Sequence, residues 1–164
     1  MFLVNSRAII ERTVNGSIEI VVQTRNKSDG PQRIELPGGR IDPFEPLHKA
    51  LIREVKEETG LDVTEIEGED TRIDTAHMNT DFAVECLQPF AVYQTTKGPF
   101  DSVGAYFRCK AIGELLQAGD ETKYPRWVNI NELQRLMSDD PLQFSDVDRA
   151  GIVFYLKYIE KHRP

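Results

Sequence analysis

The chain has 164 residues, 40% of them hydrophobic, and a formal net charge of −7. This size predicts one globular domain over residues 1–164. The acidic balance excludes a surface for nucleic-acid polymers, whose affinity comes from clustered lysine and arginine. No apolar run approaches a membrane span, and polar residues 5–7 interrupt the apolar N-terminus, so we expect a cytoplasmic protein without a membrane partner.

The first third of the chain has a β pattern. Residues 2–11 and 17–25 are predicted to be strands, joined by an Asn15-Gly16 turn that is typical of a hairpin. A short strand is expected at 33–36 before a turn at Pro37-Gly38-Gly39.

A helix is predicted to begin near Pro46 and to stop at Gly60, because proline suits a first helical turn and glycine a helix end. At 100° per residue, apolar residues near the start of this helix share one face with the three acids Glu54, Glu57 and Glu58. The buried stripe therefore continues as a carboxylate cluster near the helix C-terminus.

Glu54, Glu57 and Glu58 have i, i+3 and i+4 spacing, at which like charges repel by about 0.2–0.5 kcal/mol per pair. The helix dipole adds about 0.3–1 kcal/mol of unfavourable interaction for each acid. Hard divalent cations, magnesium or manganese, would offset this cost. The alternative is a solvated helix face whose charge is balanced by nearby lysine and arginine, as most charge runs are.

The rest of the chain predicts further strands and two helices. Strands are expected at 62–66, 89–95 and 103–111, the last two in the middle of the sheet, with a polar loop around 74–81. Residues 114–126 are expected to be irregular before a short strand at 127–128.

Helices are expected from Asn129 to about Met137 and, capped by Ser145, to about Lys161. The order of elements predicts an α/β protein with a mixed sheet covered on both faces. Cys86 and Cys109 lie in strand-like segments without the spacing of a zinc or redox motif, so both are expected to be buried reduced thiols.

The run 39–61 resembles the Nudix box. It carries the fixed residues of that family's pattern, namely Gly39, Glu45, Arg53, Glu54, Glu57, Glu58, Gly60 and the aliphatic positions Val55 and Leu61. The resemblance implies an α/β/α sandwich with a mixed β-sheet, in which the box forms a loop, a helix and a loop.

The resemblance also implies an activity. It is hydrolysis, with a divalent metal that is usually Mg2+ (Mn2+ is also considered), of a nucleoside diphosphate linked to another group. Glu54, Glu57 and Glu58 are the implied metal ligands, joined by the carbonyl of Gly38. The implied structural residues of the box are Gly39, Glu45, Arg53 and Gly60.

The proton acceptor has several candidates. Glu57 and Glu58 lie in the box, and some family members use a glutamate from a loop ahead of a late tryptophan. Glu121 lies six residues before Trp127, with Asp120 as its competitor, and an ordinary exposed loop acid is the alternative.

Two other groups of residues are candidates for substrate contacts. Arg25, at the end of a predicted strand, occupies a position where related sequences place a phosphate-binding arginine, although a solvent-facing strand end is the alternative. Five aromatic side chains are candidates to stack on a base, but aromatic residues in strand runs more often belong to the core. They are Phe44, Phe82, Phe100, Tyr106 and Trp127.

Substrate and assembly stay open at this level. ADP-ribose-type relatives carry a proline about 16 residues beyond the box, where this chain has His77, and the markers of dinucleoside polyphosphate, coenzyme A and NADH pyrophosphatases are not matched. A MutT-type or ADP-ribose-type small nucleotide substrate and a homodimer are compatible with the sequence. The rival function is a module that binds a nucleotide sugar without cleaving it, and intact box glutamates favour the enzyme.

Overall fold

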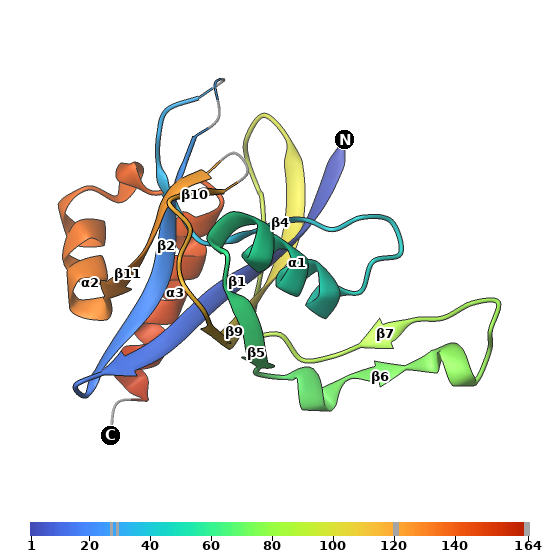
Figure 1. Cartoon of the computed structure of the whole chain (residues 1–164). Helices are drawn as coiled ribbons and strands as arrows, with labels where there is room; N and C mark the ends of the chain where they lie inside the picture. Colours follow the sequence, from blue (N-terminus) through green and yellow to red (C-terminus); the bar gives the residue numbers. More distant parts are fainter. Residues whose placement is uncertain (27, 29, 120–121, 163–164) are drawn as a thin grey trace.

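A mixed β-sheet forms the middle layer of the protein, which is described by a computed structural model over residues 1–26, 28, 30–119 and 122–162 (Figure 1). The main strand order is β10-β11-β2-β1-β9-β5, with β1 and β9 parallel and the other pairs antiparallel. β3, β4 and β8 add to β2, β1 and β9 respectively. The strands are β1 (Phe2–Val14), β2 (Ser17–Arg25), β3 (Ile34–Glu35), β4 (Gly38–Arg40), β5 (Asp62–Ile66), β8 (Ala91–Gln94), β9 (Asp101–Ile112), β10 (Ala118–Gly119) and β11 (Thr122–Asn129).

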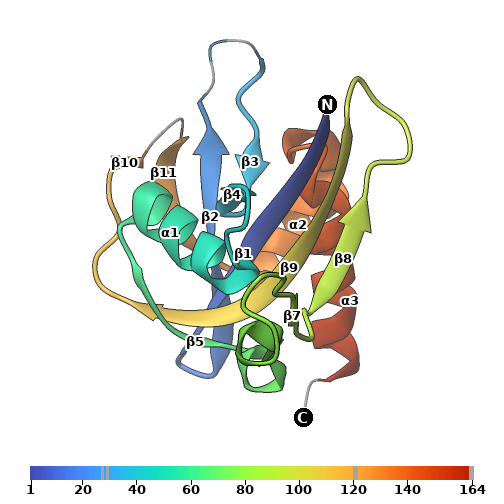
Figure 2. The same ribbon diagram turned by 90° about the vertical axis from the view of Figure 1, so that its right-hand side faces the viewer.

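Within the described residues, three helices cover the two faces of the sheet, α1 (Leu47–Thr59) on one and α2 (Ile130–Asp139) and α3 (Asp148–Lys161) on the other (Figure 2). Side chains alternate along β1: Ala8 and Ile10 pack with Leu51 of α1, whereas Ile9 packs with α2 and α3. This arrangement confirms the predicted α/β/α sandwich.

Local sequence signals set several of these elements. Asn15 and Gly16 take positive φ angles of 50° and 79°, as the predicted hairpin turn requires, and Val14 pairs with Ser17. Gly60 ends α1 in the left-handed conformation at φ 80°. The predicted turn at 37–39 differs in part, because β4 begins at Gly38 and pairs with β1.

A two-stranded hairpin projects from the sheet (Figure 1). It consists of β6 (Ile73–Asp74) and β7 (Glu85–Cys86), and a short 3-10 turn at Thr75–His77 follows β6. The polar loop expected around 74–81 lies between these strands, and β7 agrees with the strand-like segment expected at Cys86. Glu85 of this hairpin accepts a hydrogen bond from the backbone N–H of Leu47 at 2.7 Å. The hairpin therefore supplies the acidic cap that α1 lacks in its own sequence.

Three expectations need correction. Within the segment 114–126, expected to be irregular, residues 118–119 form β10 and residues 122–126 belong to β11. β11 pairs with both β10 and β2 and accommodates Pro125 at a register shift between Lys123 and Arg126. Cys86 is exposed on the projecting hairpin, whereas Cys109 is buried as expected. Of the strands at 89–95 and 103–111, β9 is interior, but β8 has β9 as its one paired neighbour in the described chain.

The C-terminal helix begins slightly later than predicted. α3 starts at Asp148, and Ser145 lies just before it. The Ser145 Oγ still accepts the backbone N–H of Asp148 at 3.2 Å, as a capping side chain does.

Across the described residues, no helix is long and apolar enough to cross a membrane. The cytoplasmic location and the extent of one domain over 1–164 stay predictions.

The packing of α1 predicts unequal costs for two neighbouring substitutions. Leu51 is fully buried and Ile52 is 40% exposed, so Leu51→Ala should lower the free energy of unfolding by about 2–5 kcal/mol through lost contacts and a cavity. Ile52→Ala on the same helix should cost clearly less. Urea unfolding of both variants measures the difference, and equal losses would contradict the assigned buried face.

Candidate active site

Most of the predicted box residues meet in one cleft of about 550 Å³ between α1, the β3–β4 turn and the N-terminal half of β1, whereas Glu45 and Gly60 do not line it. The cleft lining includes Arg25, Gly38, Gly39, Arg53, Glu54, Glu57 and Glu58, all of which the sequence singled out. A larger cleft of about 740 Å³ lies along β5 and β9, but none of these residues lines it. Size is therefore a poorer guide to this site than the chemistry of its lining.

The two glycines allow the backbone to approach its neighbours closely. Gly38 has φ 141°, and a Cβ there would clash with the backbone of Ser6 and Arg7 on the paired strand β1. A Cβ on Gly39 would lie 2.8 Å from the carboxylate of Glu54. Larger residues would thus displace either the β4–β1 pairing or an acidic side chain.

Glu58 is the most buried of the three box acids, with 9% of its surface exposed. Its Oε2 atom accepts hydrogen bonds from the Gly38 N–H at 2.9 Å and from Gln23 Nε2 at 2.8 Å. Burial raises the pKa of Glu58 to about 8, although both hydrogen bonds oppose this shift. The side chain is therefore held in one position at an electrostatic cost that a nearby cation would reduce.

Glu54 and Glu57 share one guanidinium. The Arg53 Nη1 atom lies 2.8 Å from Glu54 Oε1 and 3.4 Å from Glu57 Oε2. The Glu54 side chain is only 15% exposed, and burial raises its pKa against the opposing effect of Arg53. Glu57 is 48% exposed at the rim, so it lies less on the buried face than the helical pattern predicts.

Glu45 and Arg53 form a two-pronged ion pair. Arg53 Nε and Nη2 each donate to a carboxylate oxygen of Glu45 at 2.8 Å. These hydrogen bonds lower the pKa of Glu45 to about 2. The pair ties the loop before α1 to the middle of that helix, which matches the structural position that the sequence predicted.

The structure adds polar residues that the sequence did not single out. Glu35 and Arg7 line the cleft, and the Gln23 Nε2 atom lies 3.3 Å from Glu35 Oε1 and 2.8 Å from Glu58. Burial raises the pKa of Glu35. One sequence pattern could have pointed to these residues, namely a charged or amide side chain within a strand that is otherwise apolar. Arg7, which directly precedes Ala8-Ile9-Ile10, is an example.

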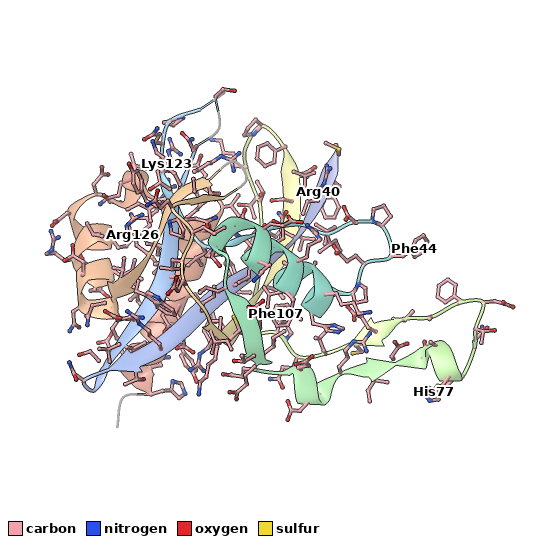
Figure 3. The ribbon with its side chains drawn as sticks, viewed as in Figure 1. Arg40, Phe44, His77, Phe107, Lys123 and Arg126 are labelled. Atoms are coloured by element: carbon pink, nitrogen blue, oxygen red, sulfur yellow. The ribbon has the colours of Figure 1, made fainter. Side chains whose placement is uncertain are left out.

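Of the other polar residues that the sequence singled out, one lines the cleft and the others do not or are not described. Arg25 lines the cleft, and its Nη1 atom is 3.7 Å from Glu35 Oε2. Glu121 and its competitor Asp120 lie outside the described residues. His77 lies on the projecting hairpin (Figure 3).

The five candidate aromatic side chains differ in burial and in whether they line the cleft. Phe100 lines the cleft at 50% exposure and Tyr106 is buried in the core. Trp127 is partly buried beneath the Arg12 guanidinium, 4.1 Å from its ring centre. Phe44 and Phe82 are exposed, and Phe44 extends away from the body (Figure 3).

Within the described chain, no three histidine, cysteine, aspartate or glutamate side chains are already gathered as a metal site. The box acids line the same cleft, but Glu54 and Glu57 are turned toward Arg53. Their oxygen atoms are the donor type that hard cations prefer.

The α/β/α sandwich and the acidic helix that faces a glycine turn together indicate one class of proteins, and comparison with known families identifies it. The model of the NUDIX domain matches residues 3–146, so the chain belongs to the NUDIX family and is a Nudix pyrophosphohydrolase. Among curated proteins, none matches the chain.

Solved structures with the same fold share little sequence with this chain. A possible asymmetric diadenosine tetraphosphate hydrolase from Jonesia denitrificans aligns over 100% of this chain and 98% of its own, with TM-score 0.71 and 15% identity. The NUDIX domain of Shewanella oneidensis NrtR, complexed with ADP ribose, aligns over 99% and 87%, with TM-score 0.65 and 14% identity. A MutT NUDIX hydrolase from Burkholderia pseudomallei aligns over 80% and 86%, with TM-score 0.58 and 18% identity.

The pairing of Glu45 with Arg53 predicts a pH-dependent loss of stability. Glu45→Gln should lower the free energy of unfolding by about 1–3 kcal/mol at pH 7, because a charge-assisted pair in a partly buried position is lost. The pKa of Glu45 falls from 4.5 to about 2 in the folded protein, so the wild-type advantage is complete above pH 4.5 and disappears as the pH falls toward 2. Urea unfolding of both proteins from pH 7 to 2.5 measures it. A difference that does not shrink in acid would contradict this account.

Proposed function

We propose that the protein is a metal-dependent hydrolase that cleaves the pyrophosphate bond of a nucleoside diphosphate linked to another group. The observation that carries the proposal is the position of Glu54, Glu57 and Glu58 in one cleft beside Gly38 and Gly39. A pyrophosphate linkage is strongly anionic, and four acids line the cleft, namely Glu35, Glu54, Glu57 and Glu58. Of the arginines in the lining, Arg7 and Arg53 are already paired with acids, so a bound cation would offset the repulsion that such a substrate meets. Family membership supports the same reaction.

The chemistry of the donor set fits Mg2+, with Mn2+ as a second candidate. Carboxylate oxygens of Glu54, Glu57 and Glu58, with the Gly38 carbonyl, are the hard ligands that these cations prefer. When bound, such a cation neutralises phosphate charge and lowers the pKa of a water molecule that attacks phosphorus in line. For Glu54 and Glu57 to act as ligands, they must turn away from the Arg53 guanidinium.

The side chains of the protein divide the remaining work. Glu58 is fixed by the Gly38 N–H and by Gln23, so its orientation is set before substrate binds. Arg25 also lines the cleft, where its guanidinium can pair with a phosphate oxygen. Arg53 holds the loop before α1 through Glu45 and is assigned a structural role.

The proton from the attacking water needs an acceptor, and we retain three candidates. Glu57 is the most exposed box acid and is open to water in the cleft. Glu58 is held by two donors. Glu121 follows from the sequence and is tested by substitution.

The substrate we propose is a small nucleotide, either a nucleotide sugar such as ADP-ribose or a nucleoside triphosphate. The solved relative that holds ADP ribose and the relatives named for MutT support including both classes in a panel. Turnover with and without Mg2+ identifies the class. Tight binding of one ligand without turnover would favour the alternative, a module that senses a nucleotide sugar. A homodimer stays a prediction.

Glu58→Gln should abolish Mg2+-dependent turnover while the melting temperature changes little. The amide oxygen keeps an acceptor for the Gly38 N–H, but a neutral group cannot replace a carboxylate toward a cation. Released phosphate, measured with a coupled phosphatase, reports the activity of wild type and variant. Normal turnover in Glu58→Gln would refute the assigned site.

Arg25→Ala should raise KM by about 10-fold or more, because one charge-assisted hydrogen bond to phosphate is lost. Lys123→Ala serves as the charge-matched control: Lys123 is also near this end of the sheet, on β11, but is not part of the cleft lining. An equal KM change in both variants would assign the effect to net charge rather than to contact with substrate.

A further inference from the structure

Asp148, the first residue of α3, is fully buried below the cleft. It lies against Arg7, which lines the cleft and is itself 7% exposed. Five donors point at this one carboxylate. Oδ1 accepts from Arg7 Nε at 2.6 Å and the Tyr106 hydroxyl at 3.0 Å, and Oδ2 accepts from Arg7 Nη2 at 2.7 Å, the Leu36 N–H at 2.8 Å and the Ser145 hydroxyl at 3.2 Å.

These contacts connect the start of α3 to the β3–β4 turn. Asp148 holds the Leu36 N–H, and Arg7 Nη2 donates to the Leu36 carbonyl at 2.7 Å. Two residues further along the same turn, the Gly38 N–H donates to Glu58 at 2.9 Å. The turn is thus held at one end by Asp148 and meets the candidate catalytic acid at the other.

A glycine in α3 supports the importance of this arrangement. Gly151 lies inside the helix, where glycine is destabilising relative to alanine. A Cβ at this position would clash with the ring of Tyr106, whose hydroxyl reaches Asp148. The helix therefore has a local gap that lets Tyr106 complete the set of donors.

We propose that Asp148 is a positioning residue for the hydrolase site, acting through Arg7 and the Leu36–Gly38 turn on the orientation of Glu58. The inference rests on the proposed function, and it makes α3 part of the active-site support although the family match ends at residue 146. Asp148 would not contact substrate. Its effect would therefore fall on the catalytic rate more than on binding.

The test compares Asp148→Asn with Tyr155→Phe. Tyr155 is also fully buried on α3, and its hydroxyl donates to Glu11 Oε2 at 2.6 Å. Each substitution therefore weakens a polar contact between α3 and the sheet: asparagine keeps one acceptor oxygen but replaces the other with an NH2 donor, and phenylalanine lacks the Tyr155 hydroxyl. Tyr155 and Glu11 do not line the cleft. The pair separates a general loss of helix docking from a specific loss of active-site geometry.

Two readouts are measured below the melting temperature of each variant: kcat and KM with Mg2+ and the best substrate, and hydrogen exchange of the Gly38 amide by NMR. Asp148→Asn should lower kcat by about 10–100-fold, the scale of a small misplacement of catalytic groups, with little change in KM and faster Gly38 exchange. Tyr155→Phe should lower the melting temperature but leave kcat and Gly38 exchange unchanged.

An unchanged kcat in Asp148→Asn, or an equal loss in Tyr155→Phe, would overturn the proposal. If Asp148→Asn does not fold, Tyr106→Phe replaces it, because this variant removes one of the five donors and keeps the ring. It should show a smaller kcat loss of the same kind, and unchanged kcat and Gly38 exchange would also overturn the proposal. If the wild type shows no turnover, the proposed function fails, whereas the exchange readout still tests the structural link.

Discussion

The buried hydrogen bond from the Gly38 N–H to Glu58 joins the two halves of the site. A carboxylate below the surface is expensive unless donors replace the lost water. Gly38 can be a donor because β4 pairs with β1 at close range, which only glycine permits at this position. The other donor, Gln23, comes from β2. The position of one acid thus depends on the register of three strands.

The negative charges of the box acids are neutralised unequally. Arg53 lies within 3.4 Å of Glu45, Glu54 and Glu57, whereas Glu58 has no such direct ion pair within the described residues. This division explains a helix that carries acids near its C-terminus against the helix dipole. Arg53 offsets the repulsion among the acids near it, and Glu58, which it does not reach, is the acid whose pKa burial raises to about 8. Glu54 and Glu57 therefore have a cationic partner in the protein itself, whereas Glu58 has only neutral donors among the described residues.

Sequence reasoning located the box helix, its glycine end and the first hairpin because local signals set them. Gly60 and Asn15-Gly16 need no distant partner to be recognised. It missed β11 between residues 122 and 126, because pairing with β2 outweighs the polar composition and Pro125. It also missed Arg7 and Glu35 as cleft residues, since the contacts that bring them there join strands and helices far apart in sequence. Asp148 lies 141 residues from Arg7, and no local pattern reports such a contact.

Cleft residues outside the box are relevant to the choice of substrate. Box residues line the cleft on the side of α1, where the proposed pyrophosphate chemistry takes place. The lining also includes Leu3 of β1, Phe100 from the loop before β9, and Val147 from the segment before α3. These three residues are apolar and lie outside the box, so they can vary without disturbing the acids. We expect these three side chains to bear on which group attached to the diphosphate is accepted, because the box residues are the same whatever that group is. Since Val147 directly precedes Asp148, the placement of α3 would affect both this apolar part of the cleft lining and the orientation of Glu58.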